Sequence, residues 1–170
     1  LLGDDLRNIA DKTRNANRSL SANVWGFEAN TIDQNLVHHN VFFSDKVNSE
    51  FYDIEKGQIP LDPTLYICAQ DREEANKGQN TERFEIILNA PPLSKRQPNK
   101  EDFEICKSVT LERFKNFGLN FQVDLERRNL TTPKDFNDLF PATEGSLYGQ
   151  SPHGMMATFQ RPKCVTSIAN

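Results

Sequence analysis

The sequence predicts an α+β fold: a mixed, largely antiparallel sheet with helices on one side. Two pairs of β-like segments follow one another without a helix between them, unlike the regular alternation of α/β proteins. Segments with helical periodicity and one apolar face separate and follow these pairs. The chain has 170 residues, of which 36% are hydrophobic, enough to bury one core without metal or disulfides. We therefore expect residues 1–170 to form a single domain.

The first part of the chain predicts a short helix and two strands. Residues 1–12 have the pattern of a helix, and apolar residues then alternate with small or polar ones over 18–29, the period of a half-buried strand. A second β-rich segment covers 36–44. A turn near 31–35 makes the two segments compatible with a hairpin that has a long loop.

A helix over 45–56 and two further strands come next. Ser44 is a typical N-cap, and Gly57 is typical of the position just beyond a helix C-terminus. The β-rich segments 64–69 and 83–90 are separated by a polar loop. The predicted apolar face of the helix consists of Val47, Phe51 and Ile54.

The clearest helical pattern covers 100–117, with Asn99 as its cap and Gly118 at its end. Residues 121–126 alternate and predict another strand. The string Thr132-Pro133-Lys134-Asp135 combines an N-cap, a proline at the first helical position and an acid at the third, which predicts a short helix. The apolar stripe of the long helix comprises Phe103, Cys106, Val109, Phe114 and Phe117.

Charge and motifs exclude several functional classes. A net charge of −4 disfavours nucleic-acid binding. Neither a Walker A sequence nor GxGxxG is present, so the chain lacks a dinucleotide-binding signature. The string GQSPH departs from the GxSxG nucleophile elbow at its last position, which leaves a hydrolase built on Ser151 and His153 as a weak alternative. No catalytic residue is assigned.

The sequence also gives no sign of a metal site. Cys68, Cys106 and Cys164 form no CxxC pair, and we expect the first two to be buried as small hydrophobic residues. His38 and His39 are adjacent in a predicted strand, so their side chains should point to opposite faces and not share one ion. The 12 phenylalanines indicate either ordinary core packing or an apolar tunnel for a long ligand.

Specific strings in this sequence resemble the carotenoid desaturases. They are RSLSANVWGFEA, LVHHNVFFSDKVNSEFYDI, DPTLYICAQDR and, most specifically, LTTPKDFNDLFPATEGSLYGQSPHGMMATFQRP. The resemblance covers residues 18 to 162 and is greatest to the 1-hydroxycarotenoid 3,4-desaturase (methoxyneurosporene dehydrogenase) branch. This branch belongs with the phytoene desaturases and, more widely, with the FAD-dependent amine-oxidase-like flavoproteins.

The resemblance implies that the chain is the substrate-binding domain of a longer bacterial oxidoreductase of carotenoid biosynthesis. The Rossmann-like FAD domain would lie outside residues 1–170, so FAD is implied for the parent protein and none is expected on this chain. The implied reaction is C–C bond desaturation of a carotenoid, with hydride transfer to the flavin. The isolated chain is expected to be inactive.

The resemblance also implies partners, a location and site residues. The partners are the carotenoid, the protein's own FAD domain and, weakly, a second copy of the chain. The location is cytoplasmic and peripheral to the inner membrane, because the substrate dissolves in lipid. His153 and Arg161 would form a flavin- or hydroxyl-facing rim. The apolar wall for the substrate would comprise Trp25, Phe27, Phe42, Phe43, Tyr148, Met155, Met156 and Phe159. The alternative from another class is a stand-alone hydrophobic-ligand carrier or interaction domain without catalysis.

Overall fold

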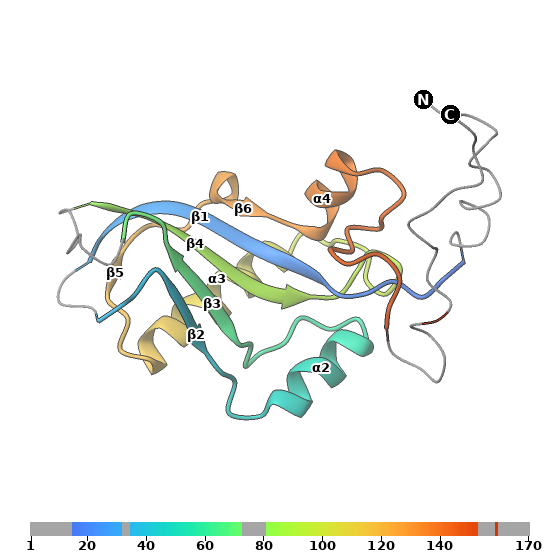
Figure 1. Ribbon diagram of the computed structural model, residues 1–170, viewed down its shortest axis with the longest axis horizontal. Coiled ribbons are helices and arrows are strands. Elements are labelled where there is room, and N and C mark those ends of the chain that lie inside the picture. Colours follow the sequence, from blue (N-terminus) through green and yellow to red (C-terminus); the bar gives the residue numbers. More distant parts are fainter. Residues whose placement is uncertain (1–14, 32–34, 73–80, 153–158, 160–170) are drawn as a thin grey trace.

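The structure of the protein is a computed structural model that describes residues 15–31, 35–72, 81–152 and 159 (Figure 1). The helix predicted over 1–12 lies outside the described residues. In chain order the elements are β1 (Ser21–Thr31), β2 (His39–Phe42), α2 (Val47–Glu55), β3 (Leu65–Ala69), β4 (Glu82–Ala90), α3 (Asp102–Asn116), β5 (Phe121–Gln122), the 3₁₀ turn η2 (Arg127–Asn129), β6 (Leu130–Thr131) and α4 (Pro133–Leu139).

The described strands form one sheet of six, in the order β2-β3-β4-β1-β5, with β6 also paired to β1. Every pair is antiparallel. The long helix α3 lies behind this sheet in Figure 1, and the face turned toward the viewer carries no helix over its centre. The predicted α+β class, with a largely antiparallel sheet covered on one side, is therefore confirmed.

The predicted hairpin between the first two strands is wrong. Strand β1 pairs with β4 over nine positions, from Ser21 opposite Ala90 to Ala29 opposite Glu82, while β2 pairs with β3. The two longest strands satisfy more backbone hydrogen bonds by pairing with each other than with a strand of four residues. This choice leaves the short β2 at the edge of the sheet, where short strands are best tolerated.

The core lies between the sheet and α3. Trp25 is fully buried, and its indole N–H donates to Thr110 Oγ1 at 2.9 Å. The Thr110 hydroxyl in turn donates to the carbonyl of Cys106 at 2.7 Å. Cys106 is buried as predicted, and its burial raises the pKa of the thiol to about 12. Phe27, Phe84 and Phe114 complete this layer with Phe121, whose ring centroid lies within 5.7 Å of each of theirs.

Helix α2 buries only part of the predicted face: Ile54 is buried as predicted, but Phe51 is not. Phe51 is 45% exposed, whereas Glu50 is 1% exposed and Ile54 is 5% exposed. The Glu50 carboxylate accepts hydrogen bonds from Thr64 Oγ1 at 2.8 Å and from Asn89 Nδ2 at 3.0 Å. These bonds compensate the cost of burying a charge, and they attach α2 to the ends of β3 and β4.

The sequence signals at other element ends are only partly confirmed. The N-caps of α2 and α3 are Lys46 and Glu101, so the predicted caps Ser44 and Asn99 are wrong. Both side chains lie two residues earlier and accept hydrogen bonds from the backbone N–H groups of those N-cap residues. Thr132 caps α4 in a capping box with Asp135, as its sequence predicts. Gly57 and Gly118 both have positive φ, at 72° and 66°. The strand predicted over 121–126 is only Phe121–Gln122, because the chain then turns into η2 to place β6 beside β1. Among the described residues, no helix is long and apolar enough to cross a bilayer.

Candidate functional site

The uncovered side of the sheet, here called the open face, is formed by alternate residues of the four strands β1 to β4. Side chains pointing toward α3 alternate with side chains on the open face, which are half-buried or exposed except for the buried Cys68, as expected for a sheet covered on one side. The open face consists of Val24, Gly26, Glu28, His39, Val41, Tyr66, Cys68, Arg83, Glu85 and Ile87.

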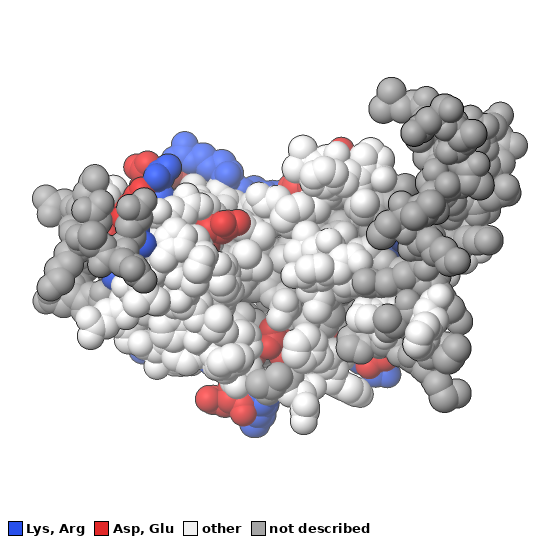
Figure 2. Space-filling view, in the orientation of Figure 1, with Lys and Arg blue, Asp and Glu red and all other residues white. Residues whose placement is uncertain are grey.

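An apolar row crosses the centre of the open face. Val41 lies opposite Tyr66, Tyr66 opposite Ile87, and Ile87 opposite Val24 in the register of the sheet. Four neighbouring strands span about 14 Å at the usual spacing. Figure 2 shows that most of this side of the molecule is uncharged, although acidic side chains interrupt it near the middle as well as at the edges. The row therefore offers a broad apolar surface to a ligand or partner.

A polar row runs beside the apolar one. Cys68 lies between His39 and Glu85 in the register. The Tyr66 hydroxyl reaches across to this row, 2.7 Å from His39 Nδ1. Burial raises the pKa of the Cys68 thiol, and the nearby Glu85 carboxylate raises it further. The open face thus combines an apolar centre with a row of hydrogen-bonding groups that includes one carboxylate.

His38 and His39 do not point to opposite faces, so that premise of the sequence analysis is wrong. Their ring centroids are 4.3 Å apart and their planes meet edge to face. His38 stands in a bend just before β2 begins, and the alternation of side chains applies only within a regular strand. Both rings therefore lie beside Cys68, whose sulfur is 3.7 Å from His38 Nε2.

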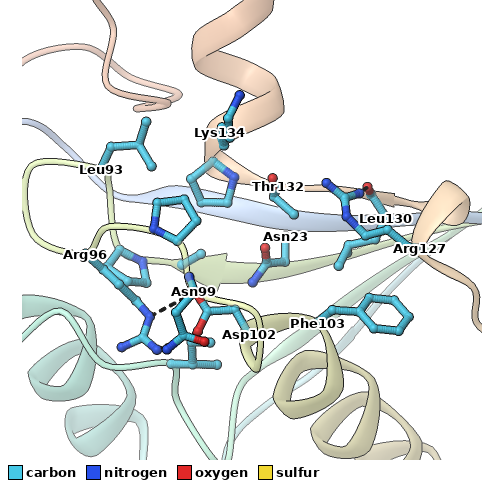
Figure 3. Close-up of a pocket in the computed structure, with 15 residues that line it drawn as sticks. Asn23, Leu93, Arg96, Asn99, Asp102, Phe103, Arg127, Leu130, Thr132 and Lys134 are labelled. Carbon is cyan, nitrogen blue, oxygen red and sulfur yellow. Dashed lines mark hydrogen bonds and ion pairs between the residues drawn. The ribbon is translucent and has the colours of Figure 1, made fainter.

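A separate cavity of about 200 Å³ lies between the segment before α3 and the start of α4 (Figure 3). Its walls include Phe103 and Leu130, together with an ion pair in which Arg96 Nη2 is 2.6 Å from Asp102 Oδ1. The volume is below the usual range of sites for drug-sized ligands. None of the predicted site residues that the structure describes lines this cavity. The open face is therefore the better candidate for a large apolar ligand.

Comparison with curated proteins finds homologues of this chain. No family model matches. The chain is 46% identical to the hydroxyneurosporene desaturase of Cereibacter sphaeroides over 98% of its length, and 44% identical to that of Rhodobacter capsulatus over 99%. It is also 30% identical, over 67% of its length, to a 4,4'-diapolycopene oxygenase of a Methylomonas species. The chain is a homologue of the carotenoid desaturases. It spans about a third of the length of the hydroxyneurosporene desaturases that it matches.

The site residues predicted for this carotenoid desaturase homologue lie in three kinds of place. Trp25 and Phe27 are in the core on the α3 side, with exposed fractions of 0% and 8%, and they present no surface to the open face. Phe42 packs on the same side, its ring 5.0 Å from that of Phe117. Phe43, Tyr148 and Phe159 are more than half exposed. Met155, Met156, His153 and Arg161 lie outside the described residues.

The sequence analysis missed Val24, Val41, Tyr66 and Ile87, which form the apolar row. Their alternation along each strand was visible, but alternation does not show which of two faces a helix covers. Large aromatic residues were favoured instead, and in this sheet the aromatic positions of β1 pack against α3.

The described helix ends do not suit the pyrophosphate of a flavin dinucleotide. An anion is favoured at a helix N-terminus that is free of acidic side chains. Here α2 carries Glu50 in its first turn, α3 carries Asp102 and Glu104, and α4 carries Asp135. The N-termini of these three helices are therefore poor candidates for holding the pyrophosphate.

Proposed function

We propose that this chain is the substrate-binding part of an FAD-dependent carotenoid desaturase, and that the polyene lies on the open face of the sheet. The observation that carries the proposal is the apolar row across an uncovered sheet, in a chain that is homologous to hydroxyneurosporene desaturases over nearly its whole length. FAD binding and the chemical step are assigned to parts of the longer protein. This chain binds the polyene, orients it and excludes water from it.

The dimensions of the sheet support a long linear ligand. Strand β1 has 11 residues, which corresponds to about 36 Å at the usual rise per residue. A rod-shaped polyene laid along the strands contacts side chains of β1 and β4, while one laid across them contacts the apolar row. The apolar row favours a hydrocarbon laid across the strands, because none of its side chains carries a charge that has to be desolvated on binding. A hydrocarbon laid along β1 and β4 would also meet Glu28, Arg83 and Glu85.

We also propose that the edge of the domain near β2 and α2 contacts the membrane that holds the substrate. This part of the chain exposes Phe43, Phe51, Tyr52 and Leu61, each at least 45% accessible. Exposed aromatic and aliphatic side chains of this kind partition into the boundary of a bilayer. Sedimentation with phosphatidylglycerol–phosphatidylcholine vesicles tests this, and Phe43→Ser together with Tyr52→Ser should reduce the bound fraction.

A chimeric enzyme tests the substrate surface. The matching third of the Cereibacter sphaeroides hydroxyneurosporene desaturase is replaced by this chain, and desaturation is followed by the longer-wavelength absorption of the extended polyene. Ile87→Lys or Val41→Lys should each lower the rate at least about tenfold, because a lysine on the apolar row places a charge against a hydrocarbon. Leu111→Lys is the matched control, since Leu111 is 40% exposed on α3, on the other side of the sheet.

Two results contradict the proposal. One is a chimera whose activity is unchanged by both open-face lysines. The other is equal loss of activity in the Leu111→Lys control. Circular dichroism of each variant separates loss of binding from loss of the fold.

A further inference from the structure

Three side chains near the edge of the sheet bring together the ligand atoms of a metal site. In the part of the chain that the structure describes, His38, His39 and Cys68 each place one nitrogen or sulfur atom so that all three atoms lie within 4.8 Å of one another. Cys68 is buried, His38 is half-buried and His39 is exposed. Imidazole and thiolate are the ligands that zinc and related borderline-soft ions prefer.

The spacing of two of these atoms already fits a tetrahedral ion. Zinc binds imidazole nitrogen at about 2.0–2.1 Å and thiolate sulfur at about 2.3 Å, so two such ligands at a tetrahedral angle are about 3.5 Å apart. His38 Nε2 and Cys68 Sγ are 3.7 Å apart. An ion can therefore replace the thiol proton between them with a shift of a few tenths of an ångström.

The proton positions on His38 also suit an ion. Its Nδ1 lies 3.1 Å from the carbonyl oxygen of Arg72. A carbonyl oxygen only accepts hydrogen bonds, so Nδ1 carries the hydrogen and Nε2 keeps its lone pair toward Cys68. Histidines that bind metal ions characteristically donate their second N–H to a carbonyl or carboxylate in this way.

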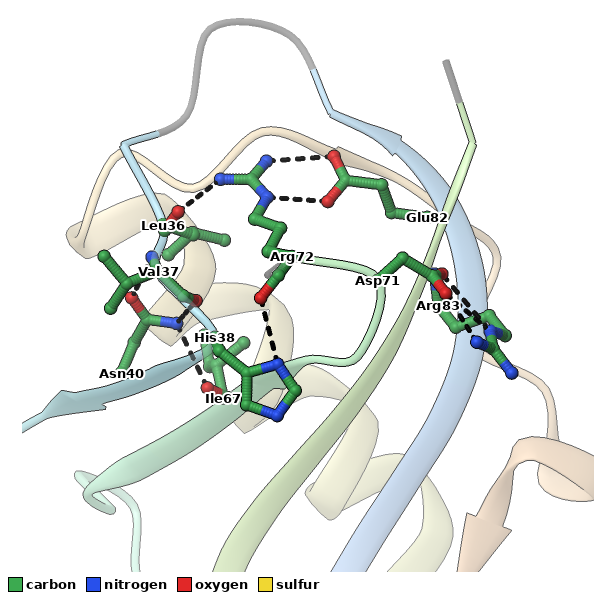
Figure 4. A network of polar contacts seen from close by, with 9 residues as sticks. All are labelled: Leu36, Val37, His38, Asn40, Ile67, Asp71, Arg72, Glu82 and Arg83. Carbon is green, nitrogen blue, oxygen red and sulfur yellow. Dashed lines mark hydrogen bonds and ion pairs between the residues drawn. The ribbon is translucent and has the colours of Figure 1, made fainter. Parts of the chain in front are cut away.

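A network of polar contacts, part-buried around Arg72 and exposed at Asn40, holds the His38 ring in place (Figure 4). The Arg72 guanidinium forms two hydrogen bonds with the Glu82 carboxylate, at 2.6 Å and 2.9 Å, and a third with the carbonyl of Leu36 at 2.6 Å. Asn40 exchanges hydrogen bonds with the backbone of Val37 on the other side of the bend. The backbone on both sides of His38 is thus fixed before any ion binds, which lowers the entropic cost of forming the site.

We propose that His38, His39 and Cys68 form a binding site for a divalent ion of the zinc class. The ion takes Nε2 of His38, one ring nitrogen of His39 and the sulfur of Cys68, and the thiol proton passes to solvent, so that one proton leaves for each ion bound. The exposed His39 leaves the fourth position open to water or to an oxygen ligand, as in three-ligand zinc sites. The ion links the edge strand β2 to β3.

Cobalt(II) and zinc(II) titrations of the chelator-treated chain test the site. We expect the chain to bind one equivalent of Co²⁺. The complex should show a near-ultraviolet thiolate-to-cobalt charge-transfer band and the strong visible bands of a tetrahedral site with a sulfur ligand. Zn²⁺ should displace the bound Co²⁺. Cys68→Ser should abolish the charge-transfer band. His38→Gln should weaken Zn²⁺ binding more than about 100-fold, beyond the range seen when a residue that merely supports a ligand is lost. Cys106→Ala is the matched control and should bind as tightly as the unaltered chain.

A measurement without substitutions guards against variants that fail to fold. Zn²⁺ should slow alkylation of Cys68 by iodoacetamide in the unaltered chain, read by peptide mass spectrometry. A chain that shows no charge-transfer band and no protection of Cys68 overturns the proposal, as does a band that persists in Cys68→Ser. Either result leaves the proposed role of the open face intact, because the apolar row contains none of the three ligands.

Discussion

Removing the hydroxyl of Thr110 is expected to destabilise the protein through the tryptophan on the neighbouring strand. Thr110 and Trp25 are both fully buried, and Thr110 Oγ1 accepts the indole N–H at 2.9 Å. Thr110→Val keeps the shape of the side chain but leaves a buried donor without an acceptor, which costs about 2 kcal/mol. For a domain of this size about 2–4 °C of Tm is lost per kcal/mol, so we expect Tm to fall by about 4–8 °C. Trp25 is the one tryptophan in the sequence, so its fluorescence reports unfolding directly.

A double-mutant cycle with Trp25→Phe isolates the hydrogen bond. Phenylalanine has no N–H, so Thr110→Val in the Trp25→Phe background should cost much less than in the unaltered chain, with a coupling energy of about 1–2 kcal/mol. Unfolding of all four proteins is followed by circular dichroism in urea. Equal destabilisation by Thr110→Val in both backgrounds would refute the assignment of this energy to the Trp25–Thr110 bond.

Three further predictions concern a turn, a helix cap and a thiol. Gly57→Ala should lower Tm more than Gly118→Ala in thermal melts. Both glycines have positive φ, which costs an alanine about 1–2 kcal/mol, but only at Gly57 would the added Cβ also collide with backbone, that of Lys95. Equal effects of the two substitutions would contradict this reasoning. Burial alone would raise the pKa of Asp135, but hydrogen bonds from Thr132 and Arg127 lower it. Asp135→Asn should therefore destabilise the protein fully at neutral pH, and the destabilisation should shrink as the pH falls below about 4. Urea unfolding midpoints measured against pH test this. Burial raises the pKa of the Cys106 thiol to about 12. The thiol should therefore be alkylated only as fast as the protein unfolds. Rapid labelling in native buffer would show that Cys106 is accessible in the folded protein.

Most local elements of this protein could be predicted from its residues alone. The cap at Thr132, the positive-φ glycines at 57 and 118 and the long helix α3 depend on residues within a few positions of one another, and such signals are readable along the chain. The family resemblance was also readable, because it depends on strings of residues and not on their arrangement in space.

The tertiary structure alone decided which strands pair and which side of the sheet stays open. Strand β1 pairs with the longer β4 and not with β2, which follows it in sequence. The resulting register places Val41, Tyr66, Ile87 and Val24 in one row. The same folding put both histidine rings beside Cys68, since His38 precedes the regular part of β2. Contacts between residues far apart in the chain depend on the register of the whole sheet and on the packing of α3, and no local pattern encodes either.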